Sequence, residues 1–571
     1  MSSLRTTTIC CMLAIAASGL IAAPKLRLST TTVGPLLIAA GQNGTTQTVD
    51  AANFGDGTLT LTATANVPWL AATAGGTRPC TLRGTCIAVQ IALNTSTLAR
   101  GRYTGTVTLN DPNAIDAPQN ITVTVSIGGI PDSFDLFLPP GGSTTAPFVS
   151  GRLTTVVTNP VGGPRLSIVG SGGGSFDFAL SYQVSATAPA GTADGDYSGR
   201  IAVVGSSFAQ DVKSVPVIAH VTSQPIAALS SSSVSFRLAQ GGPKADQAVV
   251  VNNAGLGTLT VSGTTVNPPA PWLTAKISGN VIIFTADPTG LSPGAFRTTV
   301  TIQSNARNGP TTVPVELNVL ATGPPVSYFQ GVLDNALFLA EGALAPGGIV
   351  AVFGERLTSS APVQATTLPL GTSLGGVSVF VNNTAVPVYY VSVNQINFQI
   401  PYDTPAGEAL FRVDRDGQRG NTVTATILPV VPTILRLGID NYGIIVLNDP
   451  VLTFAIRPTN GISSRPAKAG VDVVTIYSLG LGQTTPPVTA GVAAPVEPLA
   501  RVPGIKVIFG EYLIPGSAPL IEPLYAGLTP GSVGLYQINV LVPQSSPRGD
   551  QVTVFLTIGL LASNRVTLAV E

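Results

Sequence analysis

Short runs of valine, threonine and isoleucine fill most of the chain, and glycine and proline interrupt them at short intervals. Examples are the runs at 101–107, 195–201 and 294–300. Where apolar and polar residues alternate, successive side chains point to opposite faces of a strand. Many such strands separated by turn residues predict an all-β protein, built from about five tandem Ig-like β-sandwich modules.

One series of motifs occurs twice, about 200 residues apart, as expected of repeated modules. The first copy has an Asn-x-Gly-x-Gly-Thr-Leu strand at 53–59, Pro-Trp-Leu at 68–70 and a Gly-x-Tyr hairpin at 101–103; the second has the equivalent motifs at 253–259, 271–273 and 294–296. The segment between the copies keeps only the hairpin, from Gly195. The predicted modules are 24–129, a degenerate 130–223, and 224–321, followed by a proline-containing linker.

A second duplication lies near the end of the chain. Val393–Pro401 and Leu535–Pro543 contain Gln-Ile-Asn boxes at identical internal spacing, and each is followed by a Pro-x-Gly step. This repetition predicts two Ig-like halves, 331–432 and 433–571, that superpose.

The amides of the two boxes are expected to be structural. Gln395 and Asn397 should share one strand face, as should Gln537 and Asn539, because residues two apart point the same way. We expect these side chains to hydrogen-bond the backbone of neighbouring loops. The alternative is a polar ledge that binds a ligand.

Two resemblances follow from these motifs. The Asn-x-Gly-x-Gly-Thr-Leu strand, the Pro-Trp-Leu step and the hairpin resemble the BACON family, which implies a β-sandwich that binds carbohydrate or mucin. Residues 331–571 resemble the C-terminal domain of Solibacter-type secreted proteins, through Ala345-Pro346-Gly347, both Gln-Ile-Asn boxes and Tyr525-Ala526-Gly527. The connector at 448–470 departs from that pattern. This second resemblance implies a duplicated Ig-like fold and no particular activity.

The first 23 residues are predicted to be a signal peptide. Arg5 supplies the positive charge, Ile9–Ala23 the apolar segment, and Ala22 a small residue at the cleavage point. A membrane anchor is the alternative, but the apolar segment is shorter than the roughly 20 residues that a spanning helix needs. We therefore expect a secreted protein, retained at the cell surface or released, whose mature chain has no transmembrane segment.

The composition limits the classes of partner that we expect this protein to bind. Only 10% of the residues are charged and the formal net charge is zero, which gives no electrostatic basis for binding nucleic acid or an anionic membrane. A hydrophobic fraction of 44% opposes disorder. Glycans and cell-surface components remain as expected partners.

Cysteine and histidine are too few for a metal centre. After signal removal only Cys80 and Cys86 remain, and an exported protein is expected to join them in a disulfide. His220 is the sole histidine and is expected to face outward from a strand, so we predict no metal site and no cofactor.

Other motifs are predicted to be structural. The Gly-x-Ser-x-Gly pattern at 371–375 precedes a strand and has no histidine downstream, which indicates a turn rather than a nucleophile. Asp414–Gly417 indicates a hairpin turn rather than a calcium loop. Trp69 and Trp272 are expected in module cores, with sugar stacking as the alternative. Tyr389, Tyr390 and Tyr402 are expected to be exposed, yet too few for a binding face.

The sequence contains no recognisable catalytic residue. The leading hypothesis is a secreted, non-enzymatic rod of about five sandwiches for surface adhesion, extracellular structure or carbohydrate binding. The alternatives are a glycoside hydrolase that uses two carboxylates and a passive spacer in the cell envelope.

Overall fold

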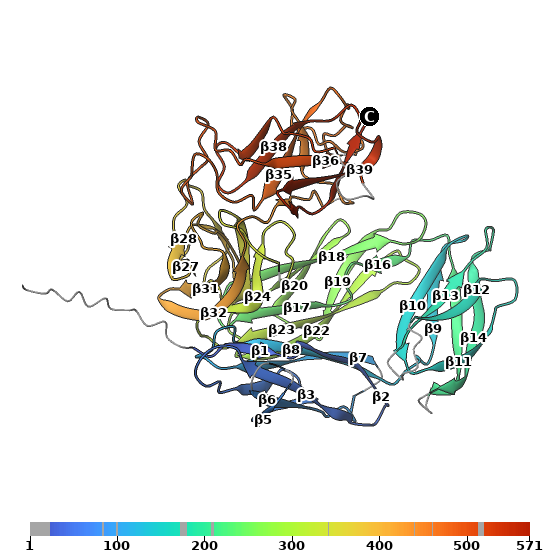
Figure 1. Cartoon of the computed structure of the whole chain (residues 1–571). Coiled ribbons are helices and arrows are strands. Elements are labelled where there is room, and N and C mark those ends of the chain that lie inside the picture. Colours follow the sequence, from blue (N-terminus) through green and yellow to red (C-terminus); the bar gives the residue numbers. More distant parts are fainter. Residues whose placement is uncertain are drawn as a thin grey trace, which may run out of the picture.

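The structure is a computed structural model of the whole chain (Figure 1). It describes residues 23–80, 82, 85–98, 101–171, 180–206, 211–340, 342–438, 440–459, 461–511 and 519–571. Within these residues the regular structure consists of β-strands, with no α-helix. The predicted signal peptide, except for Ala23, lies outside the described residues.

The strands form five two-sheet sandwiches, as expected for an all-β chain of tandem modules. The first sandwich contains β1 (Leu26–Leu28), β2 (Thr32–Ile38), β3 (Gly44–Asn53), β4 (Thr62–Ala65), β5 (Leu70–Pro79), β6 (Thr85–Leu93), β7 (Gly101–Asn110) and β8 (Gln119–Ile127). The second contains β9 (Phe134–Leu138), β10 (Ser143–Ser150), β11 (Leu153–Thr158), β12 (Arg165–Ser171), β13 (Leu180–Thr187), β14 (Gly195–Ser206) and β15 (Ser214–Val221). The third contains β16 (Ala227–Leu229), β17 (Val234–Ala239), β18 (Ala245–Asn253), β19 (Val261–Asn267), β20 (Leu273–Ser278), β21 (Val281–Ala286), β22 (Gly294–Ser304) and β23 (Thr311–Leu320).

These three sandwiches share one topology. The sheets of the first run β1-β3-β6-β5 and β2-β8-β7-β4, and those of the third repeat this order as β16-β18-β21-β20 and β17-β23-β22-β19. The second has β10-β13-β12 and β11-β14-β15-β9, which is the same arrangement without a counterpart of β1. In each, an early strand pairs in parallel with the last one, while the other pairings are antiparallel. The degenerate middle segment therefore keeps the topology although it has lost most of the motifs.

The remaining strands form the fourth and fifth sandwiches. The fourth contains β24 (Val326–Asp334), β25 (Ile349–Glu355), β26 (Val363–Gln364), β27 (Val377–Val381), β28 (Thr384–Val386), β29 (Val388–Val391), β30 (Gln395–Gln399), β31 (Gly407–Arg415) and β32 (Gln418–Ile427). The fifth contains β33 (Thr433–Ile434), β34 (Ile445–Leu447), β35 (Val473–Leu479), β36 (Ile505–Phe509), β37 (Tyr525–Leu528), β38 (Tyr536–Leu541), β39 (Gly549–Ile558), β40 (Leu561–Ala562) and β41 (Val566–Val570).

The fourth and fifth sandwiches also repeat one another. The order β24-β25-β30-β29 in the fourth corresponds to β33-β35-β38-β37 in the fifth. On the facing sheets, β27-β31-β32 corresponds to β36-β39-β41. The Gln-Ile-Asn boxes lie on β30 and β38, which are equivalent strands.

Alternation of side chains along each strand builds a separate core in each sandwich. On β23, Val313, Val315 and Leu317 are almost fully buried, while the residues between them face outward or lie part-buried. A valine or leucine side chain contributes roughly 1.5–3 kcal/mol when fully buried. Repeated over the strands, this pattern stabilises sandwiches of this size without helices.

The chain folds back on itself, so the predicted rod is wrong (Figure 1). Asp116 of the first sandwich accepts a hydrogen bond from the backbone N–H of Thr424 in the fourth, at 2.6 Å. Lys25 forms an ion pair with Glu408 across the same interface. The third sandwich joins the fourth through Arg237 and Glu355. The rod was expected because tandem modules commonly follow one another end to end, and the motifs contain no sign of docking between distant modules.

Candidate functional site

A groove of about 470 Å³ lies where the fourth and fifth sandwiches meet, and we call it the interhalf groove. Its lining comes from four strands of the fourth sandwich, β25, β26, β29 and β30, from Asn335 just after β24, and from the fifth sandwich. The lining residues are Asn335, Ile349, Gln364, Tyr389, Tyr390, Asn397, Leu435, Leu479, Val533 and Leu535. None of these described lining residues carries a charge. Aromatic, amide and aliphatic groups together fit an uncharged ligand that has both apolar faces and hydroxyl groups.

A β-bulge places both tyrosines on the groove, where they are half-buried rather than exposed as expected. Val388 pairs with Phe398 and Tyr390 pairs with Asn397, so Tyr389 is an extra residue in β29. A bulge of this kind changes where consecutive side chains point, and bulges are common beside binding sites. The hydroxyl of Tyr389 donates to the carbonyl of Val533 at 3.4 Å, and burial raises the pKa of Tyr389.

The amides of the first box hydrogen-bond each other rather than a loop backbone. Nε2 of Gln395 donates to Oδ1 of Asn397 at 2.8 Å, because residues two apart on β30 share a face. The expected backbone partner is therefore wrong for this pair. Asn397 lines the groove, and its Nδ2 has no acceptor among the described residues. That N–H group can donate to a ligand oxygen.

The fifth sandwich repeats this box but encloses its tyrosine. Gln537 donates to Asn539 at 3.3 Å, and Asn539 also accepts from the hydroxyl of Thr475, so here too the partners are side chains. Tyr525 pairs with Asn539 as Tyr390 pairs with Asn397. The hydroxyl of Tyr525 donates to the backbone carbonyl of Leu528 at 2.6 Å, and this tyrosine is only 6% exposed. The aromatic ring at this position therefore faces a groove in only one of the two copies.

A buried amide holds the fourth and fifth sandwiches together behind the groove. Gln399 is fully buried, accepts from the backbone N–H of Gly491 at 2.6 Å and donates to the carbonyl of Gly347 at 3.1 Å. It also donates to Tyr402, which was expected to be exposed but is half-buried; burial raises the pKa of Tyr402 to about 12. Sequence reasoning missed Gln399, although the second box has a leucine, Leu541, in its place.

Trp69 and Trp272 occupy equivalent positions in the cores of the first and third sandwiches. They are 7% and 8% exposed. Each directly precedes a strand, β5 or β20, and each indole packs within its own core cluster. Neither indole presents a face on which a sugar could stack.

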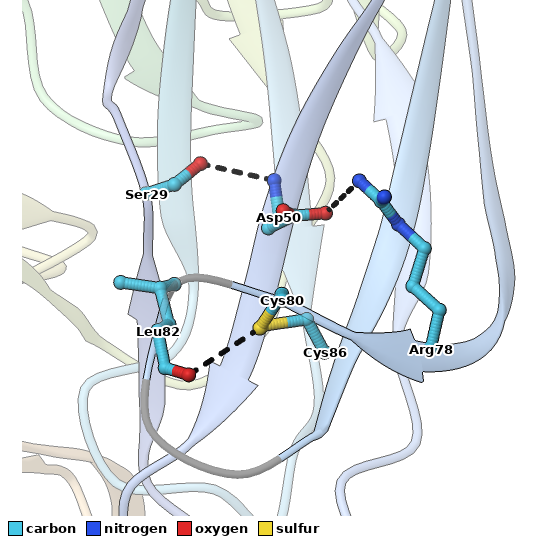
Figure 2. The surroundings of a disulfide bond; sticks show 6 residues. All are labelled: Ser29, Asp50, Arg78, Cys80, Leu82 and Cys86. Atoms are coloured by element: carbon cyan, nitrogen blue, oxygen red, sulfur yellow. Dashed lines mark hydrogen bonds and ion pairs between the residues drawn. A yellow bond between two sulfur atoms is a disulfide. The ribbon is translucent and has the colours of Figure 1, made fainter.

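Cys80 and Cys86 are joined in a disulfide with a Cα–Cα distance of 5.8 Å. Figure 2 shows its surroundings at the β5–β6 hairpin. Asp50 lies near both sulfur atoms, but it forms an ion pair with Arg78 at 2.6 Å. Cysteines bind a metal ion as free thiolates, whereas these two are bonded to each other. In the oxidised protein this group is therefore a disulfide that closes the hairpin, beside a carboxylate.

His220 lies on the outer face of β15, as expected for a strand histidine. Its ring stacks on Phe137 and its two nitrogens contact Asp135, at 3.2 Å, and Asp196, at 2.6 Å. The carboxylates stand on opposite sides of the ring and do not converge on one point. The hydrogen bond with His220 lowers the pKa of Asp196.

Two motifs that imitate functional sites are turns. Leu374 and Val377 exchange both backbone hydrogen bonds around Gly375 and Gly376, so the Gly-x-Ser-x-Gly pattern ends in a tight turn. Asp416 and Gly417, both with positive φ, connect β31 to β32 as a hairpin.

No helix within the described residues is long and apolar enough to cross a membrane.

Comparisons with known proteins yield no family. No family model matches the chain, and no curated protein matches it. Among solved structures, the chain is similar to an I-band fragment of titin at 10% identity, covering 53% of this chain and 99% of that one, with a TM-score of 0.15. It is also similar to the protocadherin gamma B4 extracellular domain at 13% identity, covering 90% and 77%, with a TM-score of 0.16. TM-scores of this size carry no argument, so the all-β class rests on the strand pairings themselves.

Proposed function

We propose that this is an exported, non-enzymatic, multi-module protein that binds neutral carbohydrate in the interhalf groove. The observation that carries the proposal is the pair of tyrosines, Tyr389 and Tyr390, which the β29 bulge presents beside Asn397 in a lining without charged groups. Aromatic faces pack against the apolar face of a sugar ring, and amides hydrogen-bond its hydroxyls.

Two further observations support an extracellular binding role. The disulfide suits an oxidising compartment, as the predicted signal peptide requires. The BACON-like motifs of the first and third modules imply carbohydrate or mucin binding by the protein, although the groove itself lies in the C-terminal region.

The groove suits binding better than cleavage or simple spacing. Hydrolysis by paired carboxylates requires two carboxyl groups at the scissile bond, whereas the described lining of the groove is formed by uncharged residues. A passive spacer depends on length, and the contact of Asp116 with Thr424 shortens the molecule by folding it back.

The test is a glycan array with the purified mature chain, followed by titration calorimetry with the neutral oligosaccharide that binds best. Tyr390→Ala should weaken binding by about tenfold or more, as expected for an aromatic residue at the centre of a contact. Tyr389→Ala should have a similar effect.

Phe54→Ala is the matched control, because Phe54 is an exposed aromatic residue on the first sandwich, outside the groove lining. It should bind like the wild type. The proposal fails if no neutral glycan binds, or if Tyr390→Ala and Tyr389→Ala both retain wild-type affinity.

A further inference from the structure

A second and larger cleft lies where the first, third and fourth sandwiches meet, and we call it the three-sandwich cleft. It encloses about 780 Å³. One wall belongs to the sheet β2-β8-β7-β4 of the first sandwich, and the other to β24, β25 and β32 of the fourth, with Arg237 of the third between them. In Figure 1 these elements meet between the blue, green and orange regions.

The side of the cleft formed by the third and fourth sandwiches has more positive than negative charge. Three arginines line it, Arg237, Arg356 and Arg419, against one carboxylate. That carboxylate, Glu355, is already occupied, because it accepts from Nε of Arg237 at 2.7 Å and from the hydroxyl of Tyr328 at 3.1 Å.

Two of these arginines have no carboxylate partner within the described residues. Nε of Arg356 donates to the carbonyl of Pro324 at 3.0 Å, which leaves its terminal nitrogens without an acceptor in the described chain. Burial lowers the pKa of Arg356, and the neighbouring charges of Arg415 and Arg237 lower it further against the opposing effect of Glu355. Arg419 is exposed at the mouth of the cleft. An anion bound at Arg356 would relieve the repulsion from Arg415 and Arg237.

The opposite wall presents hydroxyl and amide groups from adjacent strands. Thr64 on β4 pairs with Thr108 on β7, and Thr108 pairs with Asn120 on β8, so the three side chains form a row across one sheet face. The hydroxyl of Thr108 donates to Oδ1 of Asn120 at 2.8 Å. Thr62 lies two residues along from Thr64 on the same face. Such a row can hydrogen-bond a polyhydroxylated ligand along its length.

We infer that the three-sandwich cleft binds an acidic oligosaccharide, with its carboxylate or sulfate groups on Arg356 and Arg419 and its hydroxyls on the threonine wall. A planar guanidinium matches either oxyanion in a two-point contact. A nucleic acid would need a broad basic surface, whereas this chain has no net charge and the facing wall is uncharged. This site is separate from the interhalf groove, so either assignment can fail without the other.

Binding here should also hold the folded-back arrangement together. A ligand that touches the first and fourth sandwiches at once stabilises the state in which they are docked, and the stabilisation grows with its concentration relative to its Kd. Saturating acidic oligosaccharide should therefore slow hydrogen exchange at the Asp116–Thr424 contact, which lies outside the cleft lining.

The experiment is titration calorimetry of the full mature chain with an oligogalacturonate and with a sulfated oligosaccharide of the same length. A neutral maltooligosaccharide is the ligand control. Arg419→Gln and Arg356→Gln should each weaken binding of the acidic probe by about tenfold or more. Arg200→Gln is the matched protein control, because it removes the same charge from an exposed position on the second sandwich.

Arg419 is exposed and its side chain forms no hydrogen bond or ion pair with another described residue. Arg419→Gln should therefore unfold at the wild-type temperature without ligand, which separates binding from folding. Preference for one acidic probe over the other identifies the oxyanion. The inference is overturned if neither acidic probe binds, if both variants bind like Arg200→Gln, or if the neutral probe competes equally at this cleft.

Discussion

The first and third sandwiches have the same strand order, but the turn before their last strand contacts different partners. In the third, Asn308 stays inside its own sandwich: it accepts from the N–H of Ala227 and donates to the carbonyl of Ala227, both at 2.8 Å. In the first, Asp116 occupies the corresponding position, two residues before a proline, and reaches Thr424 of the fourth sandwich.

The chemistry of the two side chains explains the difference. An amide offers both a donor and an acceptor, so Asn308 satisfies both backbone groups of one residue. A carboxylate has no donor and requires donors from elsewhere, which Arg27 and Thr424 supply. Gln119 then donates to the carbonyl of Leu26 at 2.8 Å in place of the missing amide. Asparagine at this turn thus binds within its own sandwich, whereas aspartate at the equivalent turn forms a docking contact with another sandwich.

The largest expected effect tests what the two sandwiches share. Trp69→Ala and Trp272→Ala should each destabilise their own sandwich by about 3–5 kcal/mol, because each removes a buried indole from an equivalent core. Hydrogen exchange of peptides from the two sandwiches measures the local free energy of unfolding. If only one of the two variants destabilised its own sandwich, the two tryptophans would not be equivalent.

The second prediction concerns the docking turn. Asp116→Ala should weaken the contact between the first and fourth sandwiches by about 2–5 kcal/mol, because Thr424 and Arg27 lose a buried charged partner. Exchange of the Thr424 amide should accelerate. Asn308→Ala is the matched variant, and its effect should stay within the third sandwich. An unchanged Thr424 amide in Asp116→Ala would refute the docking role.

The third prediction concerns a hairpin that differs between the first and third sandwiches. The third sandwich closes β20 to β21 through Gly279 and Asn280, whereas the first has a longer loop closed by the disulfide of Cys80 and Cys86. Reduction, or Cys80→Ser with Cys86→Ser, should destabilise the first sandwich by about 2 kcal/mol, as expected for a short closed loop. Equal destabilisation of the third sandwich would show that the effect is not local.

The smallest effect is a difference in acid sensitivity. Asp287 in the third sandwich corresponds to Asn94 in the first, since each donates its backbone N–H to the preceding tryptophan's carbonyl at 2.8 Å. The hydrogen bond from Lys244, with further bonds from Thr289, lowers the pKa of Asp287 from 3.8 to about 2.

Because the folded-state pKa is lowered, this contribution to stability is present above pH 4 and is lost as the pH falls towards 2. Asp287→Asn should remove that acid dependence from the third sandwich and leave the first unchanged. The readout is local unfolding by hydrogen exchange as a function of pH. If the third sandwich of the wild type were no more acid-sensitive than that of Asp287→Asn, the Asp287 carboxylate would not contribute to its stability in this way.

The sequence predicted what depends on local periodicity and repetition. Alternating valine and threonine runs indicated the strands, and the paired Pro-Trp-Leu steps indicated two tryptophans in equivalent positions, where Trp69 and Trp272 are found. The Gln-Ile-Asn boxes indicated a duplication, and they lie on the equivalent strands β30 and β38. Such patterns repeat within a few residues or at a fixed interval, and no contact between distant segments is needed to read them.

The sequence did not predict features that depend on distant partners or on a change of register. Asp116 looks like any turn aspartate until Thr424, 308 residues away, is placed beside it. The bulge at Tyr389 changes where two consecutive side chains point, and the sequence of β29 does not predict a bulge. The threonine wall and the arginines of the three-sandwich cleft come together only because the chain folds back.

Small-angle X-ray scattering of the purified wild-type mature chain tests the folded-back arrangement most directly. The contact of the fourth sandwich with the first shortens the molecule, because Asp116 reaches Thr424 across modules that are far apart in the sequence. We predict a scattering profile that matches this arrangement, with a maximum dimension well below that of five sandwiches placed end to end. A profile of an extended rod, with the longest distances set by the first and fifth sandwiches, would contradict the account.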